Sequence, residues 1–488
     1  MIKDYLKEQI LANFGYSPTN DQEKAVNEIC NFIFSADPTE AFLLRGYAGT
    51  GKTSLVAALV KTMEQLERTC VLMAPTGRAA KVFALYANHP AFTIHKRIYR
   101  QKSIDQDSLF TLNYNMLRNV LFVVDEASMI NNGGGQQGSL LEDLITFIYG
   151  ANYTPGTEGN GSGPQISRLL LVGDDAQLPP VGEADSPALC VEELRALGLT
   201  VREVTLRQVV RQAESSGILW NATRLRQLMA ADDVYGLPQI RFSGFADVKN
   251  IPGNELIETI SNCYARYGMD ETMVVCRSNK RANAYNQGIR YQILGREEEM
   301  AGSDRLMVAK NNYFWLKPEK DATLTFLANG DIVTVEKVRN ERELYGFRFV
   351  DCTLRLSDYD DQELEATLLL DTLHNEAPAL TPERQQQLFE SVMEDYADIP
   401  QKRERLKKMK EDPYFNALQV KYAYAVTCHK AQGGQWSHLF IDQGYMTEEM
   451  LGPDYFRWLY TAITRATQTV YFVNWREEQT LASEAYES

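Results

Sequence analysis

The chain has 488 residues, 44% of them hydrophobic and 24% charged, which is the composition of an ordinary globular protein and excludes a disordered, fibrous or membrane-spanning chain. This length exceeds what one hydrophobic core usually organises, so we expect two or more domains. Acidic residues outnumber basic residues by 65 to 50, giving a net charge of −15. That balance argues against a protein that coats nucleic acid with its whole surface, but it is compatible with a local basic channel.

The amino-terminal residues, Met1 to Glu8, mix acids with bases and lack the apolar stretch of a secretory signal. No apolar run reaches the length of a membrane span, so we expect a cytoplasmic protein without a membrane partner. The seven cysteines lie far apart without a Cys-x-x-Cys pair, and the chain has only five histidines. Neither a zinc site nor a disulfide framework is therefore predicted.

Short apolar runs alternate with helical patterns along the chain, which predicts α/β architecture with parallel sheets. Three of these runs, at residues 41–45, 120–124 and 168–172, end at glycines or carboxylates. Ligands bind at the carboxyl ends of strands in such sheets. We expect a first α/β domain over residues 1–212, with a small polar excursion at about 96–119.

A second sheet is predicted to start at Thr272–Cys276 and to resume at Tyr422–Val426. The intervening residues, 306–418, are expected to form an inserted domain. Its first part has strand character at 324–327, 332–335 and 347–350, and Thr381-Pro382 opens a helical stretch. The second α/β domain would then consist of residues 213–305 and 419–488.

The strongest single motif is Gly46-Tyr47-Ala48-Gly49-Thr50-Gly51-Lys52-Thr53, a Gly-x-x-x-x-Gly-Lys-Thr string between a strand and a helix. In this motif backbone N–H groups surround phosphate oxygens, the lysine reaches the β and γ phosphates, and the threonine binds magnesium. We therefore predict ATP and Mg²⁺ as cofactors. The expected cradle consists of Gly46, Ala48, Gly49, Thr50, Gly51, Lys52, Thr53 and Ser54.

Two carboxylates and one amide follow the next strands. Behind a phosphate-binding loop, Asp125 is predicted to hold Mg²⁺ and Glu126 to polarise the attacking water. Gln177 lies just past the third strand, where its amide could sense the γ-phosphate; the alternative is a turn ended by Pro179-Pro180. These residues predict an NTPase, but they do not say what the energy is used for.

The order of further strings resembles that of superfamily 1 helicases, and in particular of their RecD-like group. The matching strings are Asn20 to Val26 (Q motif), Ala74 to Ala80 (motif Ia), Thr93-Ile94-His95-Lys96 (the Thr-x-His element), Gly173 to Gly182 (motif III), Val209-Val210-Arg211-Gln212 (motif IV), Ala423 to Gly433 with its continuation to Gln435 (motif V) and Leu459 to Ala466 (motif VI). The resemblance covers residues 20 to 475. It implies two RecA-like domains with ATP between them, a small pin-bearing insertion in the first, and an SH3-like insertion in the second; Asn329-Gly330-Asp331 resembles a turn at the start of the latter.

The resemblance also implies roles for individual residues. Gln22 would contact the adenine, and Arg211 and Arg465 would act on the γ-phosphate beside Lys52 and Glu126. Gln432, Gly433 and Gln435 of motif V would complete the nucleotide site. The implied contacts to nucleic acid are Pro75, Thr76, His95, Thr427 and His429, although a threonine or histidine in such positions is as often a structural hydrogen-bonding group.

Motif V departs from the usual pattern at Ala431, where the family has serine, and at Gln435, where it has glutamate. These changes question one nucleic-acid contact and the customary ribose contact. The glycine-rich segments around 131–165 are predicted to be mobile loops flanking a helix at 140–149. The basic run 402–410 is predicted to be a solvated helix face rather than a nucleic-acid contact.

Together these patterns predict an ATP-dependent helicase acting on single-stranded DNA and duplex junctions, as a single-chain motor with room for accessory proteins. The Thr93-Ile94-His95 and Pro179-Pro180 strings resemble the RecD-like group, which implies movement from 5′ to 3′. The open alternatives are a translocase on RNA, a DNA translocase that does not separate strands, and an ATP-gated accessory subunit.

Overall fold

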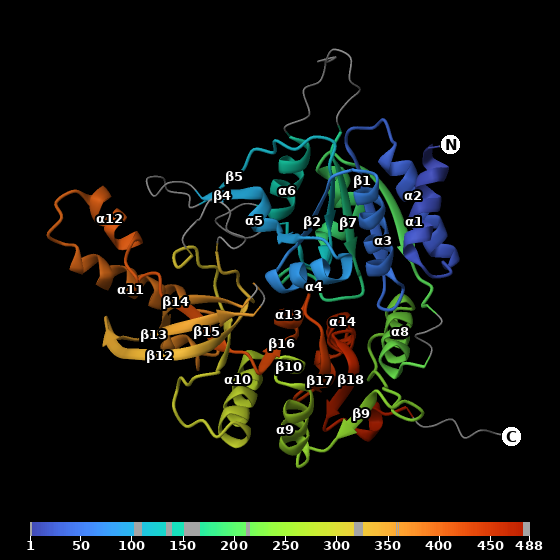
Figure 1. Cartoon of the computed structure of the whole chain (residues 1–488). Coiled ribbons are helices and arrows are strands. Elements are labelled where there is room, and N and C mark those ends of the chain that lie inside the picture. Colours follow the sequence, from blue (N-terminus) through green and yellow to red (C-terminus); the bar gives the residue numbers. More distant parts are fainter. Residues whose placement is uncertain are drawn as a thin grey trace.

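We analysed a computed structural model, which describes residues 2–101, 110–132, 139–150, 166–210, 215–316, 326–357, 359 and 361–481. Two parallel sheets lie one above the other in Figure 1, with a β-barrel beside them. The predicted α/β architecture with two P-loop-type sheets is confirmed. No helix in these ranges is long and apolar enough to cross a membrane.

The first sheet has six parallel strands in the order β3-β2-β6-β7-β1-β8. Its strands are β1 (Glu40–Gly46), β2 (Cys70–Ala74), β3 (Ala91–Thr93), β6 (Leu121–Val124), β7 (Arg168–Gly173) and β8 (Thr200–Leu206). The central strands are buried along their whole length, because helices cover both faces. One apolar cluster joins the sheet to α1 (Ile2–Phe14), α2 (Asn20–Ile33), α3 (Lys52–Gln65) and α4 (Gly77–Ala87). Another joins it to α5 (Ile94–Ile98), α6 (Leu140–Tyr149) and α7 (Val191–Ala196).

The predicted excursion contains a short antiparallel pair, β4 (Tyr99–Gln101) and β5 (Phe110–Leu112). The expected helix at 140–149 is α6, whose N-cap Ser139 accepts a hydrogen bond from the Glu142 N–H. The predicted loops on both sides of α6 fall mainly on residues 133–138 and 151–165, outside the described ranges.

The second sheet has five parallel strands in the order β16-β10-β17-β18-β9. Its strands are β9 (Val248–Ile251), β10 (Thr272–Cys276), β16 (Ala425–Thr427), β17 (Trp436–Asp442) and β18 (Ala466–Val473). The helices around it are α8 (Gly217–Ala230), α9 (Leu256–Tyr267), α10 (Asn279–Gly288), α13 (Cys428–Ala431) and α14 (Pro453–Ile463).

Two expectations about this sheet were wrong. The sheet begins with β9, 24 residues before Thr272, because Val-Lys-Asn-Ile buries only its two ends and lacks an apolar run. It resumes at Ala425 rather than Tyr422, since Tyr422 is the last residue of a barrel strand. One apolar stretch is thus divided between two sheets.

The inserted segment forms a closed barrel, β11-β12-β13-β14-β15. Its strands are β11 (Arg305–Val308), β12 (Ile332–Leu344), β13 (Phe347–Leu356), β14 (Gln362–Leu369) and β15 (Leu418–Tyr422), and two helices, α11 (Pro382–Asp395) and α12 (Lys402–Lys410), extend from it in Figure 1. Of the expected strand at 324–327, residues 324 and 325 lie outside the described part, and Leu327 forms only an isolated bridge with Asn312. The SH3-like description and the domain boundaries stay predictions.

Candidate functional site

The phosphate-binding loop connects β1 to α3, the arrangement its sequence predicted. Gly49 and Gly51 have φ values of 75° and 78°, which a side chain would disfavour. A Cβ at Gly51 would lie 2.6 Å from Nε2 of Gln22. The Lys52 ammonium donates to the carbonyl oxygens of Gly46 and Tyr47, the latter at 3.0 Å. A glycine-rich loop at the N-terminus of a helix, with a lysine ammonium held against its backbone, is suited to bind the phosphates of a nucleotide.

Gln22, in α2, stabilises this loop through hydrogen bonds. Its Nε2 donates to the Thr50 carbonyl at 2.9 Å, and its Oε1 accepts from the Thr19 N–H at 2.9 Å as part of a capping box. The structure therefore brings Gln22 to the loop, as expected. Both ends of its amide are used by the protein, so the predicted adenine contact stays a prediction.

Asp125 and Glu126 follow β6 directly. Burial and the neighbouring Glu126 raise the pKa of Asp125 to about 6. Glu126 has a left-handed backbone with φ 51°, which is uncommon for a residue with a side chain and typical of functional turns. Its Oε1 lies 3.1 Å from Nη1 of Arg465, which reaches it from the end of α14. Glu126, predicted to polarise the attacking water, and Arg465, predicted to act on the γ-phosphate, are thus in direct contact.

The described residues contain no cluster of three His, Cys, Asp or Glu side chains that could hold a metal ion. A site for Mg²⁺ with a nucleotide does not need one, because phosphate oxygens and waters supply most of the ligands. Asp125 and Thr53, at the carboxyl end of β6 and in the first turn of α3, fit the two protein positions.

The motif III segment after β7 is in contact with the second sheet's helices. The Leu178 N–H donates to Oγ1 of Thr461 at 2.8 Å, and Nε2 of Gln432 donates to the Leu178 carbonyl at 2.7 Å. Gln177 beside it is buried, and its Oε1 has no hydrogen-bond partner among the described residues. An unused acceptor at this position leaves the amide available to a ligand or to bound water.

Tyr460 of α14 is a site residue that the sequence analysis did not single out. Its hydroxyl accepts from the Ala48 N–H at 2.9 Å and donates to Oδ2 of Asp174 at 2.7 Å. Burial raises the pKa of this phenol well above its usual value, so it keeps its proton. Tyr460 lies inside the motif VI string, but only the fold shows that its hydroxyl joins the phosphate-binding loop to motif III.

Motif V does not lie where the resemblance implied. A Cβ at Gly433 would lie 2.8 Å from Cβ of Ala79, and Oε1 of Gln435 accepts from the Tyr86 hydroxyl at 3.0 Å. Both partners belong to α4, which follows β2, and two strands separate β2 from β1 and its loop. The structure therefore does not bring Gly433 and Gln435 to the phosphate-binding loop, whereas Gln432 reaches motif III.

The predicted nucleic-acid residues fall into two groups. Pro75 and Thr76 lead into α4, where Thr76 caps the helix by accepting from the Ala79 N–H at 3.2 Å. Thr427 and His429 lie at the facing end of β16 and in α13. Both pairs lie at the carboxyl ends of β-strands, near the contact between Gly433 and α4. A nucleic-acid strand bound there would cross both sheets.

His95 is set apart from these groups. Its ring packs against Tyr99 at 5.6 Å and against Phe326 of the inserted domain at 6.4 Å. Burial lowers the pKa of His95, which favours its neutral form. Arg211 lies outside the described residues.

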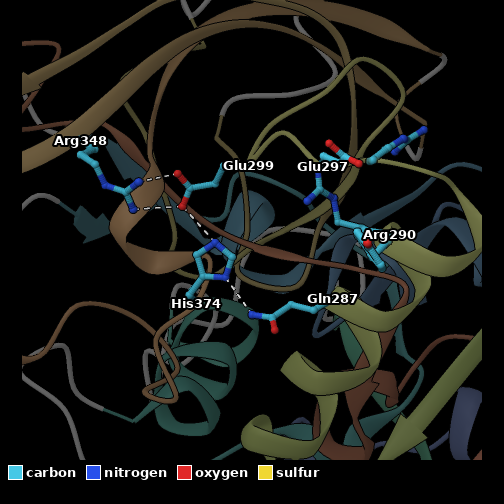
Figure 2. A pocket seen from close by; sticks show the side chains of 8 residues that line it. Gln287, Arg290, Glu297, Glu299, Arg348 and His374 are labelled. Atoms are coloured by element: carbon cyan, nitrogen blue, oxygen red, sulfur yellow. Dashed lines mark hydrogen bonds and ion pairs between the residues drawn. The ribbon is translucent and has the colours of Figure 1, made fainter.

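A cavity of about 860 Å³ opens between α10 and the barrel, far from the phosphate-binding loop along the chain (Figure 2). The Glu299 carboxylate accepts from Arg348 of β13 and lies 3.0 Å from Nε2 of His374, whose Nδ1 lies 3.1 Å from Nε2 of Gln287. These contacts tie the barrel to the second sheet's helices. Glu299, Arg348 and His374 pair within the cavity, whereas Arg290 and Arg296 pair with Asp304, so these side chains connect the barrel to the segment that follows α10.

Models of two known protein families match two separate parts of the chain. A model of the AAA domain matches residues 30–183, and a model of the UvrD-like helicase C-terminal domain matches residues 422–473. The chain is 30% identical over 178 residues to an ATP-dependent RecD2 DNA helicase of Deinococcus radiodurans, which is 36% of this chain and 20% of that protein. It therefore spans about a fifth of the length of this curated relative.

Other similar proteins cover more of the chain at lower identity. An uncharacterized protein of Acanthamoeba polyphaga mimivirus is 22% identical over 93% of this chain and 99% of its own length. Among solved structures, the Pif1 helicase from Bacteroides in complex with ADP-AlF3 and single-stranded DNA has a TM-score of 0.47 at 14% identity, over 96% of this chain and 95% of that one. Residues 30–183 thus resemble an AAA domain and residues 422–473 resemble the UvrD-like helicase C-terminal domain, and the ordered motifs are similar to those of RecD-like superfamily 1 helicases.

Proposed function

We propose that this chain is an ATP-driven motor that moves 5′ to 3′ along single-stranded DNA and separates the strands of a duplex junction, with Mg²⁺ bound beside the nucleotide. The observation that carries the proposal is the set of contacts from α14 to the nucleotide site. Arg465 pairs with Glu126, and Tyr460 bonds both Ala48 and Asp174. Because the two sheets meet at these atoms, a change in the bound nucleotide acts directly on how the sheets sit against each other.

The chemistry of the chain's own residues follows from this geometry. Lys52 compensates phosphate charge, Asp125 and Thr53 hold the cation, and Glu126 orients the attacking water. Arg465, which contacts Glu126 through Nη1, donates to the developing charge on the phosphate. Thr76 on one side and Thr427 and His429 on the other then grip the polymer in turn.

The proposed DNA substrate draws support from the names of similar proteins: the Deinococcus protein is called a DNA helicase, and the Bacteroides structure contains single-stranded DNA. A steady-state ATPase assay tests the proposal, with no polymer, with single-stranded DNA and with single-stranded RNA of matched length. Stimulation by DNA supports the motor. Stimulation by RNA alone would indicate an RNA translocase, and binding without turnover would indicate an ATP-gated accessory subunit.

A further inference from the structure

Helix α8 covers the phosphate-binding loop from the side of the second sheet. Ile218, Ala222 and Leu225 pack into the same apolar cluster as α14 and β18, so the helix is anchored on the second sheet. Its start is fixed by Asp247, whose carboxylate accepts from the Ser216 hydroxyl at 2.7 Å and from the Gly217 N–H at 2.9 Å. The placement of α8 over the loop is therefore set by buried contacts.

One face of α8 meets the loop itself. Leu219 and Arg226 are seven residues apart, which is two helical turns, so they share a face. A Cβ at Gly49 would lie 3.0 Å from Cδ2 of Leu219, and the Arg226 guanidinium lies 4.2 Å from the centre of the Tyr47 ring. Both contacts fall on the Gly46–Thr53 string.

The Arg226 guanidinium keeps most of its donors unused. Its single hydrogen bond runs from Nη1 to the Arg207 carbonyl at 3.4 Å, and its Nε is buried without a hydrogen-bond partner among the described residues. Stacking on Tyr47 occupies the face of the group, whereas its N–H donors point outward in its plane. A fixed cation with free in-plane donors is suited to oxyanions.

The position along the loop indicates which phosphate would be reached. Lys52, the lysine of the β and γ phosphates, donates to the carbonyl of Tyr47 at 3.0 Å. Arg226 lies over that same residue, so it stands at the terminal-phosphate end of the cradle. We infer that Arg226 is a nucleotide-binding residue that donates to the terminal phosphate of a bound nucleoside triphosphate.

This inference rests on the proposed ATP site and adds a third arginine to those that the motifs indicate. It differs from a structural reading, in which the stack only attaches α8 to the loop. A structural arginine would affect ADP and ATP alike. A residue that contacts the terminal phosphate discriminates between them.

The test measures the Kd of the full chain for ADP and for a non-hydrolysable ATP analogue, both with Mg²⁺. Arg226→Gln should weaken analogue binding at least tenfold more than ADP binding, the loss expected for one hydrogen bond between charged groups. Arg226→Lys should recover part of the preference, because it keeps the charge but loses the planar fork. Arg224→Gln is the matched control, since it removes the same charge from the same helix without a contact to Tyr47 in the described structure.

Equal weakening of both nucleotides, or no change, would overturn the inference and leave Arg226 as a packing residue. The same titration with Lys52→Ala distinguishes this from failure of the proposed function. If the wild-type chain binds neither nucleotide, or if Lys52→Ala binds both as tightly as wild type, the ATP site itself is wrong. If Lys52→Ala weakens binding and Arg226→Gln leaves the preference intact, only the role of Arg226 is lost.

Discussion

Nη1 of Arg465 lies 3.1 Å from Oε1 of Glu126; Glu126 follows β6 of the first sheet, and Arg465 lies in the turn between α14 and β18 of the second. The Arg465 side chain is 4% exposed and also donates from Nε to the Thr461 carbonyl at 3.3 Å. Glu126 and Arg465, the proposed water-polarising carboxylate and arginine finger, are therefore held together in this arrangement, and each restrains the other.

Arg465→Ala is expected to lower ATP turnover by about 10³-fold or more, the effect of arginine fingers in related phosphoryl transfer. Arg457→Ala in α14 is the control, because its partners are Asp185 and the Ala184 carbonyl rather than the nucleotide site. Steady-state kinetics with saturating ATP gives the comparison. A loss below tenfold would remove Arg465 from the catalytic residues.

Lys52→Ala is expected to abolish turnover while the chain stays folded, since the lysine serves phosphate charge and does not belong to the core. Lys61→Ala, on the exposed side of the same helix α3, should behave as wild type. Circular dichroism and a thermal melt check the fold. Turnover at the wild-type rate in Lys52→Ala would contradict the assignment of the site.

Tyr460→Phe keeps the ring but removes the hydroxyl that joins Ala48 to Asp174. Oδ2 of the buried Asp174 then loses its donor, a change worth about 1–3 kcal/mol for an unsatisfied buried group, while Oδ1 keeps the Ala176 N–H. We expect lower kcat and weaker stimulation by DNA. Tyr455→Phe is the matched control, because this buried tyrosine of α14 bonds Gln443 instead. Equal kcat in the two variants would show that the Tyr460 hydroxyl does not couple the sheets.

Much of this site could be predicted from the sequence, because its parts are local. The phosphate-binding loop and Asp125-Glu126 each follow the end of one strand. A short stretch of sequence therefore identifies these residues and also predicts where they lie in the fold. Tyr460 and Ala48 are 412 residues apart, and no local pattern indicates that they touch. The same holds for Gln435, whose contact with Tyr86 depends on how α4 and the second sheet meet. Contacts between residues of the two sheets could therefore be identified only from the three-dimensional structure.

Asp125→Asn is expected to stabilise the nucleotide-free chain at pH 7 while abolishing Mg²⁺-dependent turnover. The folded-state pKa of Asp125 is raised to about 6 from an ordinary value of 3.8, so ionising this carboxyl costs folding free energy. That cost is absent below pH 3.8, grows between pH 3.8 and about 6, and is complete above it. Thermal melts of both proteins across this range measure it. A stability difference independent of pH would refute the raised pKa.

Direction of movement is tested with duplexes that carry one single-stranded tail. A 5′ tail should support unwinding in the presence of ATP and Mg²⁺, and a 3′ tail alone should not. Preference for the 3′ tail would reverse the subgroup expectation without affecting the ATP site. Equal, weak unwinding of both would indicate a translocase that needs a partner to split the duplex.

The chain passes from the second sheet's domain into the barrel and back again at adjacent positions. Its first and last strands pair, with Leu306 opposite Tyr422, and the buried Asp304 beside this junction binds both Arg290 and Arg296. The insertion does not interrupt the host sheet, because β10 and β16, which flank it along the chain, pair directly with each other. The barrel is thus a self-contained insertion whose two ends lie next to each other. Changes in the length or sequence of the barrel are therefore expected to leave the pairing of the host strands intact.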